Sequence, residues 1–189
     1  FSFQGAKIIT TNEGGVLITK KKSIYDKARL NSILGRTDSK MMFWSDFIGY
    51  RYGMSNLNAA LGISQLNKIN KVIKLKREIF SIYEKTLTKN NNINFIKEPK
   101  YGFSNCAYPN ILIKGGNRKI RDKIIKELEK NNIASRAMFP QISSMKMYKH
   151  NKSNVNAIIA SNTGITLPSP YYLNEKDINR IYKILNSNL

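Results

Sequence analysis

The chain has 189 residues, of which 41% are hydrophobic, enough for one large domain or two small ones with a buried core. Its net charge of +20 is unusual, yet the basic residues do not cluster with interleaved aromatic residues and no nucleic-acid motif is present, so we expect no nucleic-acid partner. The single cysteine, Cys106, excludes a disulfide framework and zinc spacing, and no apolar run approaches the ~20 residues of a membrane span, so we expect a cytoplasmic protein with no metal site and no membrane segment.

The first stretch, residues 1–15, reads FSFQGAKIITTNEGG. The alternation in Phe1-Ser2-Phe3 predicts the end of a β-strand, and the apolar run at 15–19 predicts another. Lys7 follows small or flexible residues that let a backbone pass close to a ligand. A hydroxyl five residues before a lysine, both beside a strand end, suits a site in which the lysine forms a Schiff base with an aldehyde cofactor and the serine binds its phosphate.

This stretch resembles the Schiff-base segment of the nucleotide-sugar aminotransferases, which are fold-type-I enzymes with a usual wording close to FSF-x-x-x-K-x-ITT-G-EGG. The resemblance implies pyridoxal 5'-phosphate as cofactor, Lys7 as the catalytic lysine and Ser2 as a cofactor-binding hydroxyl. Asn12 replaces the usual glycine, a mild departure because asparagine tolerates a positive φ. In the family this lysine lies near the middle of a longer chain, so we expect an α/β fold that forms the C-terminal half of such an enzyme.

The next predicted element is a helix over residues 23–34, capped by Ser23 and stopped by Gly35. Its core-facing side chains should be Ile24, Ala28 and Leu30. Residues 36–48 have no clean period and predict a loop, with large apolar side chains at 41–44. Because such a loop would be a liability in water, we expect it either to pack under its own domain or to contact a partner subunit, and we favour the partner.

Residues 49–62 read GYRYGMSNLNAALG, with Ser55 as a candidate helix cap. This segment resembles the family element GYNYRMSNLQAALG, and with the following ISQLNKI it matches the perosamine synthases best. The resemblance implies a homodimer with shared active sites, in which the segment reaches the partner's cofactor phosphate. Arg51 replaces the usual asparagine and Gly53 a basic residue. Arg51 could bind that phosphate, or it could be a solvated surface residue.

A helical pattern covers residues 57–89 with a bend expected near 67–70. The bend would connect the end of a large cofactor domain, residues 1–70, to a small α/β domain, residues 71–189. Strands are predicted at 93–96, 107–114, 134–139 and 164–167. Helices are predicted at 117–131 and after Asn174, with the core-facing residues Ile120, Ile124, Leu128, Ile178, Ile181 and Leu185.

Residues 135–148 resemble the substrate-side strand and loop of the family, roughly TRPVFYPVHTMPMY. Arg136 and Tyr148 match, whereas Ser143 stands where histidine is common, so the resemblance implies substrate-binding roles for these three residues. A simpler alternative pairs Arg136 with a nearby acid. The lone histidine, His150, lies in a polar stretch and is expected to be a surface residue.

The resemblance implies a transaminase that moves an amino group, from glutamate in most relatives, to a 4-keto-6-deoxy nucleotide sugar, as in perosamine-type synthesis for surface polysaccharide such as lipopolysaccharide O-antigen. Lys7 would move the proton between donor and cofactor. Two alternatives remain: a catalytically inactive regulatory or remnant relative, and a basic nucleic-acid-binding protein. A dehydratase relative is disfavoured, because those enzymes carry histidine at the Lys7 position.

Overall fold

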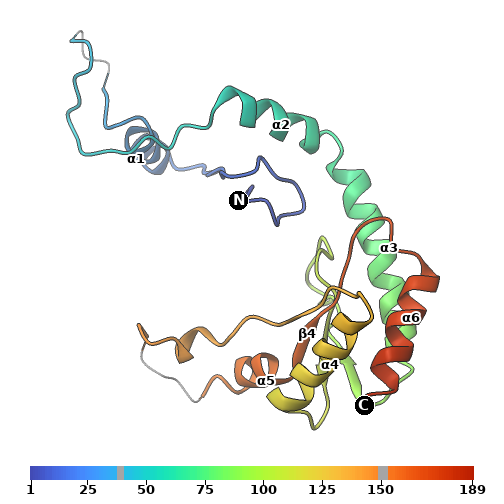
Figure 1. Cartoon of the computed structure of the whole chain (residues 1–189). Coiled ribbons are helices and arrows are strands. Elements are labelled where there is room, and N and C mark those ends of the chain that lie inside the picture. The colour runs from blue at the N-terminus through green and yellow to red at the C-terminus, as the bar shows by residue number, and fades with distance from the viewer. Residues whose placement is uncertain (38–40, 149–152) are drawn as a thin grey trace. The chain divides into compact units, whose positions relative to one another are not determined.

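Figure 1 shows a computed structural model of the chain, which describes residues 1–37, 41–148 and 153–189; His150 lies outside this range. The chain divides into two compact units, Phe1–Asn70 and Lys71–Leu189. The elements in chain order are α1 (Lys22–Ser32), α2 (Asn56–Leu66), α3 (Ile69–Leu87), β1 (Ile93–Phe95), β2 (Asn110–Ile113), α4 (Arg118–Lys130), β3 (Arg136–Ala137), a 3-10 turn η1 (Ile142–Ser144), α5 (Val155–Thr163), β4 (Gly164–Thr166) and α6 (Glu175–Asn186). None of the described helices is both long and apolar enough to cross a membrane.

The first unit begins with a closed loop. Backbone bonds of 2.9 Å join Phe3 N to Gly14 O and Val16 N to Phe1 O. Ser2 and Gly15 form an isolated antiparallel bridge. The strand predicted at 15–19 is wrong. Val16 bonds Phe1, but Leu17 and Ile18 are exposed and have no backbone partner among the residues that the structure describes.

Helix α1 begins earlier than predicted. Its N-cap is Lys21, with no side-chain cap bond, and Ser23 lies inside the helix, so the Ser23 cap is wrong. The helix buries no residue, and Ile24 is 44% exposed, which contradicts its predicted place in a core. The helix also ends earlier than predicted, at Ser32. Leu34 and Gly35 follow it with φ of +67° and +66°, and the Gly35 amide donates to Leu30 O at 2.8 Å.

The long helical pattern is broken into two helices, as predicted. Ser55 caps α2 by accepting from Asn58 N at 3.2 Å. The break falls at Asn67 and Lys68, between the end of α2 and the start of α3. The 19-residue α3 then buries Tyr83 and Leu87 in the core of the second unit.

The second unit is an α/β layer structure around a four-stranded antiparallel sheet of order β1-β2-β4-β3. One sheet face carries isoleucines and Phe95 in register, for example Ile111 opposite Ile165. Helices α3, α4 and α6 pack on that face (Figure 1). The completely buried hydrophobic side chains are Tyr83, Leu87, Ile111, Ile124, Leu128, Ile165, Ile178 and Leu185.

Two caps in this unit were predicted from the sequence. Asn117 caps α4 by accepting from Ile120 N, and Asn174 forms a reciprocal capping box with Asp177 at the start of α6. Ile120 is 37% exposed, however, so its predicted place in the core is wrong. Helix α5 was not predicted, and the four strands are shorter than expected.

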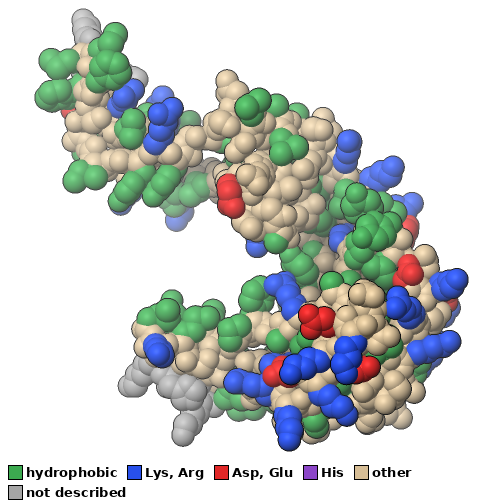
Figure 2. All heavy atoms as spheres, viewed as in Figure 1, with side chains coloured by type: hydrophobic (Ala, Val, Ile, Leu, Met, Phe, Trp, Pro, Cys, Tyr) green, Lys and Arg blue, Asp and Glu red, His purple; other side chains and the backbone are tan. Residues whose placement is uncertain are grey.

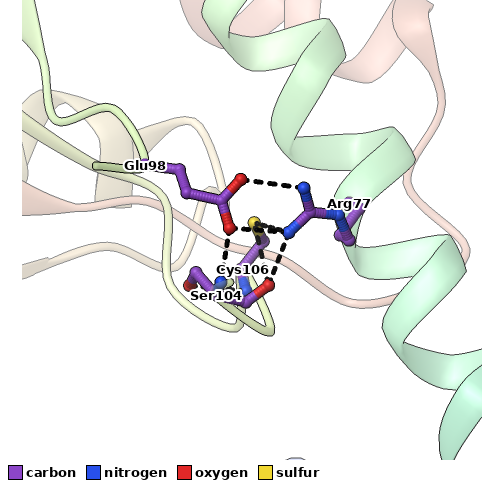
Figure 3. A network of polar contacts seen from close by, with 4 residues as sticks. All are labelled: Arg77, Glu98, Ser104 and Cys106. Atoms are coloured by element: carbon purple, nitrogen blue, oxygen red, sulfur yellow. Dashed lines mark hydrogen bonds and ion pairs between the residues drawn. The ribbon is translucent and has the colours of Figure 1, made fainter. Parts of the chain in front are cut away.

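The loop between β1 and β2 is fixed to α3 by the polar network of Figure 3. Arg77 on α3 donates to both carboxylate oxygens of Glu98 at 2.8 Å and to Ser104 O at 2.7 Å. The Arg77 guanidinium also lies 4.3 Å from the centre of the Phe103 ring. Cys106 ends the network in a left-handed conformation, with φ +51°, and burial raises the pKa of its thiol.

Candidate functional site

Lys7 lies on the turn of the first loop. The Lys7 amide donates to Gln4 O at 2.9 Å, and the Ala6 amide donates to Gln4 Oε1 at 2.9 Å, which sets the turn. The Lys7 side chain is exposed, and within the described ranges no residue forms a hydrogen bond or ion pair with its amine. The amine is therefore available to react with a ligand.

The threonines after Lys7 anchor the turn to α2. The Thr10 amide donates to Gln65 Oε1 at 3.1 Å, and the Thr10 hydroxyl donates to Phe3 O at 2.8 Å. Thr11 is completely buried. A Cβ at Gly62 would lie 2.9 Å from Thr11 Cγ2, so a small residue is needed there. Asn12, which stands where the family usually has glycine, has φ +70°, a left-handed value that asparagine adopts more readily than most residues. Sequence reasoning missed the supporting role of Gln65.

Ser2 belongs to the same loop as Lys7. Its hydroxyl oxygen accepts a long bond, 3.4 Å, from Gln4 N, and its side chain is exposed. The adjoining backbone is tight, since a Cβ at Gly15 would lie 2.8 Å from Phe1 O. The loop thus presents one hydroxyl and one amine on a backbone that is held by its own hydrogen bonds.

Arg51 lies on the segment that leads into α2. It forms an isolated bridge with Ile33, and Tyr50 and Tyr52 on either side stack with ring centres 4.9 Å apart. Because side chains alternate along an extended segment, Arg51 points away from the two tyrosines. Its guanidinium is exposed and has no hydrogen-bond or ion-pair partner in the part of the chain that the structure describes. No hydrogen bond or ion pair joins Arg51 to Ser2 or Lys7 within those residues.

The loop before Arg51 has an ordered base and an apolar surface. Asp46 accepts from the Thr37 hydroxyl and from Trp44 Nε1, the latter at 2.8 Å, and these two bonds lower the pKa of the Asp46 carboxyl. Met42, Phe43 and Ile48 are 80%, 77% and 91% exposed. Figure 2 shows hydrophobic side chains gathered over this part of the first unit. An apolar surface of this kind marks an interaction surface.

The three predicted substrate residues all lie in the second unit, on one stretch of chain. Arg136 is on strand β3, at the sheet edge. Ser143 is on η1, where the side-chain amide of Gln141 donates from Nε2 to the Ser143 hydroxyl oxygen. Tyr148 is 56% exposed and ends a turn, which is closed by a bond from its amide to Met145 O. No carboxylate among the described residues pairs with Arg136.

The described residues hold no group of three or more His, Cys, Asp or Glu side chains that could bind a metal ion. The described acids of the first unit offer little to a cofactor ring. Asp26 pairs with Lys22 at 2.6 Å, and Asp46 is occupied by Thr37 and Trp44. Glu13, on the Lys7 loop, is the one described acid of this unit whose exposed side chain has neither an ion pair nor a hydrogen bond within the described residues.

Comparison with known proteins gives one consistent family. The DegT/DnrJ/EryC1/StrS aminotransferase family matches residues 1–186. GDP-perosamine synthase of Vibrio cholerae is 35% identical over 173 residues, which cover 89% of this chain and 46% of that protein. GDP-perosamine synthase of Escherichia coli O157:H7 is 35% identical over 181 residues, or 94% of this chain and 48% of that protein. The chain therefore spans about half the length of these relatives.

Solved structures share the fold. The aminotransferase TlmJ from Streptoalloteichus hindustanus superposes with a TM-score of 0.88 at 20% identity, over 99% of this chain and 50% of that one. PseC of Helicobacter pylori, an aminotransferase involved in pseudoaminic acid biosynthesis, gives a TM-score of 0.84 at 22% identity, over 98% of this chain and 51% of that one. The expectation of an α/β fold that forms a C-terminal part of an aminotransferase is confirmed.

Proposed function

The chain belongs to the DegT/DnrJ/EryC1/StrS aminotransferase family, and from this premise we propose that its protein transfers an amino group to a nucleotide-linked sugar with pyridoxal 5'-phosphate as cofactor. Two GDP-perosamine synthases among the relatives support a nucleotide-sugar acceptor. The observation that carries the proposal is the Lys7 loop. On a backbone braced by α2 it presents a hydroxyl and a primary amine, and the amine has no partner among the described residues.

The Lys7 loop fits the proposed cofactor. Lys7 would hold the aldehyde through its Nζ, and Ser2 would donate its hydroxyl to the phosphate. A Cβ at Gly5 would meet nothing closer than Asn12 O at 3.8 Å, so the backbone before Lys7 leaves space for a ligand. When bound, pyridoxal phosphate supplies the carbonyl carbon that takes up the amino group and the ring that withdraws electrons from it.

In this proposal the chain's own residues move the proton and hold the geometry. The Lys7 amine takes the proton from the α-carbon of the donor and returns it at the cofactor carbon, acting first as base and then as acid. The turn must keep that amine within hydrogen-bond reach of both atoms. The Thr10–Gln65 and Thr10–Phe3 bonds resist its movement, which gives these residues a positioning role.

The proposal extends to the two substrates and to a dimer of the protein. Glutamate would donate the amino group and a 4-keto-6-deoxy nucleotide sugar would accept it, with Arg136, Ser143 and Tyr148 on the substrate side. Two copies would share their sites, because the apolar 41–48 loop calls for a covering partner and Arg51 has no acceptor in its own described chain. A guanidinium from a partner is well suited to a phosphate.

Reductive labelling tests the proposal directly. The protein expressed from its complete reading frame is reduced with borohydride after loading with pyridoxal phosphate, and its peptides are mapped by mass. The pyridoxyl group should be found on Lys7, and Lys7→Ala should lose amino transfer to a keto-sugar nucleotide while its far-UV circular dichroism is unchanged. Lys20→Ala, which removes an exposed lysine of the same unit, is the matched control.

Other outcomes separate the alternatives. A label on a different lysine would contradict the assignment of Lys7. Cofactor labelling at Lys7 without amino transfer to any keto-sugar nucleotide would instead indicate a catalytically inactive relative. Retention on DNA or RNA that falls steeply with salt, together with no cofactor label, would favour the basic nucleic-acid binder.

A further inference from the structure

We infer that Arg136 and the polar row beside it form a binding site for an oxyanion of a small-molecule substrate, either a carboxylate or a phosphate. The site lies wholly within the second unit, so it is built from contacts that the structure places in one compact body. The inference deepens the proposed function and rests on it for the identity of the anionic substrate. The oxyanion chemistry itself rests on the geometry that follows.

The row is set by strand register. Asn110 on β2 lies opposite Thr166 on β4, and Thr166 lies opposite Arg136 on β3. Residues directly opposite in antiparallel strands place their side chains on the same sheet face. In the neighbouring row Ile111 and Ile165 belong to the hydrophobic core, so the Asn110–Thr166–Arg136 row lies on the other face.

Two members of the row are already fixed by hydrogen bonds. The Thr166 hydroxyl donates to Asn110 Oδ1 at 2.7 Å, and Asn110 Nδ2 donates to Tyr108 O at 2.9 Å. Thr166 is buried, with 9% of its surface exposed. These bonds hold the Asn110 and Thr166 side chains in one geometry, and such preorganisation favours selective binding.

The guanidinium of Arg136 is held by aromatic rings and not by an acid. Its central carbon lies 5.6 Å from the centre of the Tyr108 ring and 5.1 Å from that of the Phe139 ring, within the range of cation–π attraction. Among the described residues no acceptor takes any of its N–H groups. The second unit has other carboxylates in contact with cations, for example Glu98 with Arg77 and Glu84 with Lys97, but none with Arg136.

This combination is suited to an oxyanion. The rings orient the planar guanidinium through its faces, and its edge keeps the fork of N–H donors that matches a carboxylate or a phosphate.

Equilibrium binding is the first test, because it does not depend on turnover. Glutarate and inorganic pyrophosphate are titrated calorimetrically into the whole protein and into the Arg136→Met, Arg136→Lys and Arg118→Met variants. Arg118 is an exposed arginine of the same unit whose one described contact, to Asn162 Oδ1, is 3.4 Å long, so its variant controls for lost charge. Arg136→Met should weaken one of the two probes by about tenfold to a hundredfold, and Arg136→Lys by less.

The choice of probe identifies the source of the anion. Weakened glutarate binding, with a raised KM for the amino donor, assigns the site to the donor's carboxylate. Weakened pyrophosphate binding, with a raised KM for the sugar nucleotide, assigns it to the diphosphate. The inference is overturned if the wild-type protein binds neither probe, or if Arg136→Met binds both as the Arg118→Met control does. A protein that binds a probe through Arg136 yet transfers no amino group would refute only the proposed function.

Discussion

Arg77 on α3 and Glu98 in the β1–β2 loop are joined at two points, Nη1 to Oε1 and Nη2 to Oε2, each at 2.8 Å. A fork of this kind is stronger and more directional than a single-point ion pair. The Ser104 amide donates to the same carboxylate, so Glu98 ties the two ends of the loop to each other and to the helix. The Arg77 bonds, followed by the Ser104 amide bond, lower the pKa of Glu98 from 4.5 to about 2.

The lowered pKa predicts a specific acid dependence of stability. Since the folded state holds the Glu98 proton less tightly than the unfolded state, the Glu98 contribution is complete above about pH 4.5 and is lost as the pH falls toward 2. Urea unfolding at pH 7 and at pH 3 should show a smaller acid loss of stability in Glu98→Gln than in the wild type. Glu129→Gln, an exposed acid without an ion pair in the described structure, should match the wild type. Equal acid losses in Glu98→Gln and the wild type would contradict the assignment.

Tyr83 predicts a graded loss of stability in the second unit. Its ring is completely buried, its hydroxyl donates to Pro168 O at 2.9 Å, and burial raises its pKa. Tyr83→Phe should cost about 1–2 kcal/mol, because it removes one buried hydrogen bond. Tyr83→Ala should cost about 3–5 kcal/mol, because it also leaves a cavity. Thermal or urea unfolding measures both. Tyr172→Ala, at a 77% exposed tyrosine, should stay within about 0.5 kcal/mol, and a Tyr83→Ala value equal to it would be incompatible with this core.

Shared active sites predict complementation between inactive variants. Lys7→Ala and Arg51→Ala protomers carry different tags and are purified as mixed dimers. If each site takes Lys7 from one subunit and Arg51 from the other, one of the two sites in a mixed dimer regains both groups, and about half of the wild-type activity should return. Unmixed variants should stay inactive or weakly active. Proven mixed dimers without recovery would show that the two residues serve the same subunit's site or that Arg51 is a surface residue.

The 189-residue chain by itself should hold pyridoxal phosphate weakly. It offers Lys7, the Ser2 hydroxyl and Arg51, while the described acids Asp26 and Asp46 are already engaged. Each missing charge-assisted hydrogen bond should cost about 1.5–3 kcal/mol, or roughly tenfold or more in affinity. After incubation with the cofactor and gel filtration, the purified chain should be colourless. A yellow protein peak at the folded elution volume would show that most of the site lies in these residues.

Local signals in the sequence predicted the helix starts that depend on a side chain. Asn117, Asn174 and Ser55 cap their helices as expected, because each has its acceptor oxygen within reach of the backbone two or three residues on. Ser23 has the same chemistry but lies two residues after the N-cap position, which Lys21 occupies, since α1 already begins at Lys22. Helix α5 has a weakly amphipathic sequence and an N-cap, Asn154, whose side chain makes no cap bond, so no local signal marks it.

Features that depend on contacts between distant segments could not be predicted from local sequence patterns. The run at 16–18 has strand-like composition, but a strand requires a neighbour along its length and the described chain supplies none beyond Val16. At the site, motif resemblance predicted Lys7 and Ser2, and the structure places both on one loop, though it does not test their roles. The Gln65 support, and the Asn110–Thr166–Arg136 row, depend on contacts between segments tens of residues apart. No spacing rule within one segment contains that information.

The core of the second unit is closed by its last helix. Ile178, Ile181 and Leu185 of α6 join Tyr83 and Leu87 of α3, and Asn90 bonds Asn186 across 96 residues of sequence. During synthesis, at about 5–20 residues per second, the apolar face of α3 therefore waits roughly 5–20 s for its partner helix to be made. The unit must complete its folding after α6 has left the ribosome. In the cell, this interval is when the nascent chain most needs a chaperone, and slower translation would lengthen it.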